Sequence, residues 1–153
     1  MKHQKDSPPR LARADLLRAR CIVEPEREIK GEVLFSSSPI AFLQGVDPEK
    51  GVVSEKKHEI FNKPFTNKIL VFPYTVGSSV GAYVIYRLKK NRMAPRAMIN
   101  QTSDIITASG CALSGIPLFD LPSNSIERFA NADKVSIDSM AQVTIESRKE
   151  SKR

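Results

Sequence analysis

One segment is more informative than any other in this chain: Lys68-Ile69-Leu70-Val71-Phe72-Pro73-Tyr74-Thr75-Val76-Gly77-Ser78-Ser79-Val80-Gly81-Ala82-Tyr83-Val84-Ile85-Tyr86. Its apolar run, residues 69–72, is typical of a buried strand. Apolar residues then recur three and four positions apart, at Val80, Tyr83, Val84 and Leu88. This spacing predicts a helix that buries all four side chains on one face. The glycine–serine turn between strand and helix places hydroxyls at a helix N-terminus, where backbone N–H groups and the helix dipole favour negative charge.

The glycine–serine turn has three interpretations from its residues alone. The first is that Ser78 and Ser79 only cap the helix, since serine is a preferred N-cap. The second is a hydrolase elbow, because residues 77–81 fit G-x-S-x-G, but that mechanism needs a later histidine and none follows His58. The third is an anion site for a small acidic metabolite. The lysine of a nucleotide-binding P-loop is missing, because Val80 follows the serines.

The net charge of +7 belongs to the ends of the chain. Residues 1–20 have a net charge of +4 and residues 147–153 of +3, so the intervening sequence is neutral. We therefore expect a basic N-terminal extension over residues 1–17, one domain over 18–146 and a basic tail over 147–153. No aromatic residue lies among the basic ones, which argues against nucleic-acid binding. The apolar runs are too short to span a bilayer and the N-terminus is polar, so we expect a cytoplasmic protein without membrane contact.

Metal ligands are scarce in the sequence. The two cysteines, Cys21 and Cys111, are far apart and neither belongs to a CxxC pair. Two thiols cannot complete a tetrahedral cysteine site or hold an iron–sulfur cluster alone, so we expect both to be small buried apolar residues. The only histidines, His3 and His58, lie in polar segments. We predict that this chain binds no metal by itself.

The remaining periodicity predicts a mixed α/β domain. Strands are expected at 21–23, 33–35, 52–53, 69–72, 97–99 and 116–119, with a C-terminal hairpin formed by 134–138 and 142–146. A second helix is expected from Ser103 as its cap to about Ser109, ended by Gly110. The alternation of strands and helices between residues 68 and 119 implies parallel strands with helical crossovers.

Four motifs of the sequence are similar to the small subunit of the aconitase X family. They are Ser38-Pro39-Ile40-Ala41-Phe42-Leu43-Gln44-Gly45-Val46-Asp47-Pro48-Glu49-Lys50-Gly51, the segment from Val71 to Tyr86, Ala94-Pro95-Arg96-Ala97-Met98-Ile99-Asn100, and Gly115-Ile116-Pro117-Leu118-Phe119-Asp120. Their order and spacing match over about residues 20–146. The resemblance implies a swivelling β/β/α domain like the C-terminal domain of aconitase. It also implies a separate large subunit that holds an iron–sulfur cluster, expected to be 4Fe–4S.

The same resemblance assigns roles to residues of the turn. Aconitase-type enzymes use the first serine of Gly-Ser-Ser as the base that removes a proton next to a carboxylate, and this residue is Ser78 here. Gly77 lets the backbone turn tightly, and Ser79 would support the site or cap the helix. In aconitase an arginine that helps to bind substrate follows the two serines. Val80 occupies that position here, so another group must take over this role.

Three further residues are substrate-binding candidates. Gly45 and Asp47 belong to a loop that faces the active site in the family, although Asp47-Pro48 can equally be a simple turn. Asn100 ends a predicted strand, and ligands often bind at the carboxyl ends of strands in α/β layers.

Two classes of function are expected. The first, implied by the resemblance, is a hydro-lyase subunit that acts on a small phosphorylated hydroxyacid, namely (R)-5-phosphomevalonate in the archaeal-type mevalonate route. Within the family, dehydration of hydroxyproline or of another hydroxyacid is an alternative. The second class is a non-catalytic module that binds an anion at the helix N-terminus.

Overall fold

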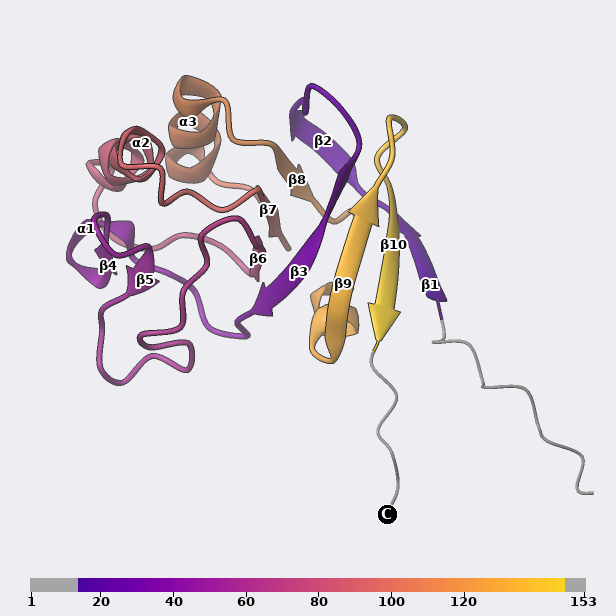
Figure 1. The fold of residues 1–153 in the computed structure, drawn as a ribbon, viewed down its shortest axis with the longest axis horizontal. Helices are drawn as coiled ribbons and strands as arrows, with labels where there is room; N and C mark the ends of the chain where they lie inside the picture. The colour runs from indigo at the N-terminus through magenta and orange to yellow at the C-terminus, as the bar shows by residue number, and fades with distance from the viewer. Residues whose placement is uncertain (1–13, 148–153) are drawn as a thin grey trace, which may run out of the picture.

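The structure, a computed structural model, describes residues 14–147 (Figure 1). Its elements along the chain are β1 (Ala14–Arg18), β2 (Arg20–Val23), β3 (Ile29–Phe35), α1 (Phe42–Gly45), β4 (Val46–Asp47), β5 (Val52–Val53), β6 (Ile69–Phe72), α2 (Gly81–Lys90), β7 (Ala97–Asn100), α3 (Ile105–Ser114), β8 (Leu118–Asp120), the 3-10 helix η1 (Ile126–Phe129), β9 (Ala132–Ile137) and β10 (Gln142–Ser147). The described part of the chain has no helix that is long and apolar enough to cross a membrane.

Eight strands form one sheet in the order β1-β10-β9-β3-β6-β7-β8-β2. Strands β3, β6, β7 and β8 are parallel neighbours, whereas β2 and the group β9, β10 and β1 pair antiparallel. The expected parallel strands with helical crossovers and the C-terminal hairpin are therefore confirmed. The short strands β4 and β5 form a separate hairpin.

The molecule has three layers, with the parallel strands in the middle. Helices α2 and α3 cover one face of these strands, and the antiparallel group lies on the other side (Figure 1). Alternate residues of β6 belong to different cores: Ile69 and Val71 pack with the antiparallel strands, and Leu70 and Phe72 pack with the helices. Because both faces are covered, every residue of β6 and β7 is buried. This arrangement confirms the expected β/β/α fold.

The face of α2 differs from the prediction. Val84 and Leu88 are buried as expected, and Ile85 is buried with them. Val80 and Tyr83 instead remain exposed, although their spacing placed them on the same apolar face. The core therefore needs only part of the apolar surface that the sequence of this helix provides.

The boundaries of α3 also differ from the prediction. Asp104, not Ser103, caps the helix and accepts hydrogen bonds from the N–H groups of Ile106 and Thr107. Gly110 lies inside the helix, where a Cβ atom would approach Ile85 Cδ1 to 2.8 Å and the carbonyl oxygen of Ala82 to 3.1 Å. Gly110 thus permits close packing of α3 on α2. The helix ends at Gly115, which has a left-handed φ of 66°.

The sheet begins earlier in the chain than the sequence suggested. Strand β1 starts at Ala14, ahead of the boundary expected at residue 18, because residues 14–18 pair with β10. The rest of the expected N-terminal extension, and residues 148–153 of the expected basic tail, lie outside the described residues.

Candidate functional site

The loops that follow the parallel strands meet at one edge of the sheet. Residues 36–41 follow β3, residues 73–80 follow β6, and residues 101–104 follow β7. Because the strands are parallel, all these loops leave from their carboxyl ends, which is where ligands bind in open α/β sheets. We call this side of the molecule the C-terminal edge. It contains Ser78.

The glycine–serine turn forms the start of α2. Gly77 has a φ of 94°, a conformation that residues with a side chain rarely adopt. The carbonyl oxygen of Ser78 accepts a 2.9 Å hydrogen bond from the N–H of Gly81, so Ser78 lies in the turn that leads into α2. Its Oγ accepts a 3.2 Å bond from the N–H of Val80. A hydrogen bond donated to Oγ favours the ionised hydroxyl over the neutral one.

The two serines differ in their contacts. The cap residue of α2 is Val80 and no side chain caps the helix, so neither serine is the N-cap that the sequence suggested. Ser78 Oγ accepts its bond within the turn before the helix, whereas the Ser79 side chain makes no hydrogen bond within residues 14–147. Both residues are exposed. The Ser79 hydroxyl thus remains available to a ligand or a partner.

The loop after β3 packs beside the glycine–serine turn. The N–H of Ile40 donates to the carbonyl of Tyr74 at 3.2 Å, and the N–H of Val76 donates back to the carbonyl of Ile40 at 3.1 Å. Ala41 follows directly. A Cβ atom at Gly45 would lie 3.4 Å from the Ala41 side chain, and one at Gly77 would lie 3.7 Å from it. The structure therefore brings Gly45 and Gly77 to the same neighbour.

Asp47 lies elsewhere. Its carboxylate accepts hydrogen bonds from the N–H groups of Glu49 and Lys50, which makes it the first residue of a tight turn. The carbonyl of Pro48 in this turn accepts a 2.8 Å bond from the side chain of Asn91, at the C-terminal end of α2. Ser78 is at the other end of this helix, which has ten residues and is about 15 Å long. The structure does not bring Asp47 to Ser78, and its contacts match the simple-turn interpretation.

Asn100 is buried at the base of the glycine–serine loop. Its Nδ2 donates a 3.1 Å hydrogen bond to the carbonyl of Phe72, the last residue of β6. A carbonyl can only accept, so this bond fixes which end of the amide faces Phe72. The Oδ1 atom is fully buried and has no hydrogen-bond partner within the described part of the chain. An unsatisfied buried acceptor costs about 1–3 kcal/mol, which is typical of strained or functional positions.

Sequence reasoning missed a polar network that joins the glycine–serine loop to α3. The Asp104 carboxylate accepts from the N–H of Thr75 at 2.9 Å and from Thr107 Oγ1 at 3.0 Å, in addition to its capping bonds. The hydroxyls of Thr75 and Thr107 are 2.5 Å apart and both residues are buried. Aspartate before an apolar run is a helix-start signal, but its second role depends on a residue that is distant in the sequence.

A second network holds the loop after β3. The Oε1 atom of Glu59 accepts hydrogen bonds from the hydroxyls of Ser36 and Ser37 and from the N–H of Ser38. Partial burial raises the pKa of Glu59, but these hydrogen bonds outweigh the burial and the pKa lies below its usual value. Nothing in the local sequence links Glu59 to a serine turn more than twenty residues earlier.

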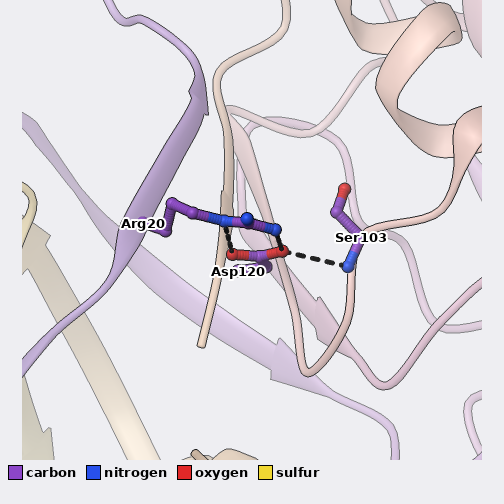
Figure 2. Close-up of polar contacts among 3 residues, drawn as sticks. All are labelled: Arg20, Ser103 and Asp120. Carbon is purple, nitrogen blue, oxygen red and sulfur yellow. Dashed lines mark hydrogen bonds and ion pairs between the residues drawn. The ribbon is translucent and has the colours of Figure 1, made fainter. Parts of the chain in front are cut away.

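Asp120 completes the C-terminal edge at the end of β8 (Figure 2). It is buried and accepts two hydrogen bonds from the exposed guanidinium of Arg20, at 2.9 and 2.6 Å. Its Oδ2 also accepts from the N–H of Ser103 at 3.2 Å. The ion pair between Arg20 and Asp120 thereby links β2 to β8. The hydrogen bond from Ser103 links Asp120 to the loop that leads into α3.

The residues of this chain do not fit an iron–sulfur cluster. Cys111 is buried beside the sulfur of Met98, and burial raises the pKa of its thiol to about 12. Cys21 is exposed, which corrects the expectation that both thiols would be buried. Within residues 14–147, no group of three or more histidine, cysteine, aspartate or glutamate side chains is placed to hold a metal ion.

Known proteins that resemble this chain share both its sequence and its fold. The family model described as the aconitase X swivel domain matches residues 16–146. The phosphomevalonate dehydratase small subunit of Methanococcoides burtonii is 49% identical over 111 residues, which cover 72% of this chain and 81% of the relative. The protein of the same name from Thermococcus kodakarensis is 43% identical over 122 residues, which cover 80% of this chain and 89% of the relative.

A solved structure agrees with these relatives. The crystal structure of Thermococcus kodakaraensis aconitase X in its holo-form superposes with a TM-score of 0.76 at 39% identity, and the match covers 86% of this chain and 98% of that one. The family model spans nearly all of the described residues, and this likeness extends to the fold. This chain therefore belongs to the aconitase X swivel-domain family.

Proposed function

We propose that this chain is the small subunit of a phosphomevalonate dehydratase. This hydro-lyase removes water from (R)-5-phosphomevalonate to give trans-anhydromevalonate 5-phosphate, in the archaeal-type mevalonate route to isoprenoids. One observation carries the proposal: relatives of that name match at 43–49% identity over a region that includes the glycine–serine turn. We further propose that the complex works in the cytoplasm.

In this proposal Ser78 is the base. Its Oγ takes the proton from the carbon next to the substrate carboxylate, while the hydroxyl leaves from the neighbouring carbon. A serine hydroxyl is a weak base, so its ionised form needs stabilisation. The N–H of Val80 already donates to this oxygen, and the N-terminal end of α2 adds a favourable field. Both interactions favour the alkoxide.

The large subunit supplies what this chain lacks. We propose that it holds an iron–sulfur cluster, of the 4Fe–4S type, which acts as a Lewis acid toward the leaving hydroxyl. The two cysteines of this chain cannot provide the ligands, since two thiols are too few. The site is then shared, with the base on one chain and the metal on the other.

Gly77, Ser79, Gly45 and Asn100 are the proposed substrate neighbours in this chain. Gly77 and Gly45 keep the backbone beside Ala41 free of side chains. The Ser79 hydroxyl has no partner within residues 14–147, and Asn100 has a buried acceptor without one. We do not include Asp47, because its carboxylate is used in a turn at the far end of α2.

The test combines this chain with its large subunit under anaerobic conditions and measures dehydration. We expect Ser78→Ala to lower turnover about 10²- to 10⁴-fold, the usual contribution of a positioned base. Ser139→Ala is the matched control, since it removes an exposed hydroxyl of equal size in the turn between β9 and β10, away from the proposed site. Gel filtration checks that each variant still forms the complex.

Three results would contradict the proposal in different ways. Full activity of Ser78→Ala would show that Ser78 is not the base, although the chain could still be the small subunit. If the wild-type pair dehydrated 4-hydroxyproline or another hydroxyacid, and not (R)-5-phosphomevalonate, the substrate assignment would be wrong. Failure of the wild-type chain to associate with any cluster-bearing subunit would exclude the function altogether.

A further inference from the structure

Exposed apolar side chains gather around the glycine–serine turn. They are Tyr74, Val76, Val80, Tyr83 and Ile105, with exposed fractions of 46%, 39%, 52%, 62% and 80%. We call these five residues the apolar rim. Scattered exposed apolar residues are ordinary on a protein surface, whereas a contiguous group marks a contact site.

Backbone contacts bring the segments that carry the apolar rim together. Tyr74, Val76 and Val80 lie within one loop, and Tyr83 is in the first turn of α2. The N–H of Thr75, between Tyr74 and Val76, donates to Asp104, the residue before Ile105. A Cβ atom at Gly81 would lie 3.4 Å from Ile106 Cγ2, so the first turns of α2 and α3 are in contact.

The segments that carry the apolar rim have almost no charge. Residues 73–86 contain no lysine, arginine, aspartate or glutamate, and residues 101–109 contain only Asp104. The Asp104 carboxylate accepts hydrogen bonds from Thr75, Ile106 and Thr107. Arg20 at the same edge is paired with Asp120. Charged residues make up 27% of the whole chain, so these segments are depleted in charge. A surface without charge fits a neutral, apolar partner and argues against an anionic one such as nucleic acid or a lipid headgroup.

We propose that the apolar rim is the surface on which the large subunit docks. This inference rests on the proposed function, which requires a second chain to meet Ser78. The rim surrounds the turn that carries Ser78, so a partner seated on it would exclude water from the base. Two of its members are tyrosines, which are enriched at protein–protein interfaces and at their energetic hot spots.

The distribution of apolar residues around α2 supports the same inference. Its apolar residues cover more of the helix than the core uses, because Val80 and Tyr83 face outward while Val84, Ile85 and Leu88 face inward. Burial of the outward pair by a partner would account for the excess.

The experiment changes residues that lie outside the glycine–serine turn. Tyr83→Glu and Ile105→Glu place a charge in the proposed interface, at early helix positions where glutamate is compatible with the helix dipole. Met140→Glu is the matched control. Met140 is 65% exposed and lies just after β9. The end of β9 pairs with Ile29, at the start of β3. Met140 is therefore at the edge of the sheet opposite to the C-terminal edge.

Each variant is titrated into the large subunit of a phosphomevalonate dehydratase, and complex formation and dehydration are both measured. We expect each rim variant to raise the Kd at least tenfold, and the double variant at least a hundredfold. Turnover at saturating small subunit should stay within about twofold of the wild type. Met140→Glu should leave the Kd unchanged.

Three outcomes would overturn the proposal. Wild-type affinity of the double variant would exclude the rim as the interface, while the loss of activity in Ser78→Ala would still support the proposed function. An equal loss of affinity in Met140→Glu would show that any surface charge acts non-specifically. If the chain alone formed a dimer that Tyr83→Glu dissociated, the occupant of the rim would be a second copy.

Discussion

The two ends of the parallel strands differ in charge and in shape. At the C-terminal edge, the loops around Ser78 are almost free of charged residues and present the apolar rim. At the opposite edge, residues 24–30 and 87–96 contain ten charged residues among seventeen. The largest of the described cavities also lies there, with a volume of about 640 Å³ between Lys30, Lys89, Arg96 and Pro117.

If this chain provides half of a shared site, as we propose, its largest cavity is not the best guide to its chemistry. A cavity that one chain closes by itself can be recognised in that chain. A site that two chains close together presents an open surface until the partner arrives. The loop geometry at Ser78, and not a hollow, therefore identifies the functional edge.

The largest difference between the two edges is expected at Gly77. Its φ of 94° strains any residue with a Cβ atom, so Gly77→Ala should displace Ser78 and lower turnover of the assembled enzyme about 100-fold. Gly115→Ala is the control, because Gly115 has a similar positive φ, lies at the charged edge and has open space around it. It should lower the free energy of unfolding by about 1 kcal/mol and leave turnover unchanged. Equal loss of turnover in both would mean that the two edges do not differ in function.

A smaller effect is expected at Glu59, which holds the serine turn after β3. Glu59→Gln should lower the free energy of unfolding by about 1 kcal/mol, since the carboxylate is largely exposed and its hydrogen bonds are partly screened. The pKa of Glu59 is below its usual value, so its contribution is complete above that value and is lost as the pH falls through the lowered pKa.

Thermal melts of wild type and Glu59→Gln across pH 2 to 7 would check this prediction. The two curves should differ at neutral pH and converge in acid. A difference that persisted at the lowest pH would show that the glutamate acts through packing and not through its charge.

The smallest effect is expected at Arg96, at the charged edge. Its guanidinium donates to the carbonyl of Lys30 and is otherwise exposed. Arg96→Ala should change the free energy of unfolding by less than about 1 kcal/mol and leave both turnover and affinity for the large subunit as they are. Calorimetry and the same titration would test this, and a marked loss of affinity would extend the interface to the charged edge.

Much of the fold could be predicted because its signals are local. The continuous apolar run of β6, the alternation in β9 and β10 and the glycine–serine turn each follow from neighbouring residues. Glycine is a common helix end, but Gly110 lies inside α3 because it packs on Ile85, a contact that no local pattern reveals. Ser103 and Asp104 are both preferred cap residues, so residue type alone does not decide which of them begins the helix.

The candidate site could be predicted less completely. The position of Ser78 before α2 follows from the turn itself, and the structure places Gly45 and Gly77 beside the same residue, Ala41. From the sequence, Asp47 can be either a turn residue or a ligand-binding residue. Its hydrogen bonds with Glu49 and Lys50 make it a turn residue, and the bond between Pro48 and Asn91 places this turn at the C-terminal end of α2. The roles of Asp104 and Glu59 could not be found, because each joins segments more than twenty residues apart.

By itself, the sequence determined the family, the α/β middle of the domain and the turn that presents Ser78, because these depend on residues that are adjacent or regularly spaced. The tertiary structure decided which strands are neighbours, which face of α2 is buried and which loops share the C-terminal edge. These features depend on contacts between segments that are distant in the sequence. The free energy of such contacts cannot be predicted from a local pattern of residues. The exposed face of Val80 and Tyr83 is the clearest case, since an apolar residue has the same spacing whether it packs inside its own chain or against another.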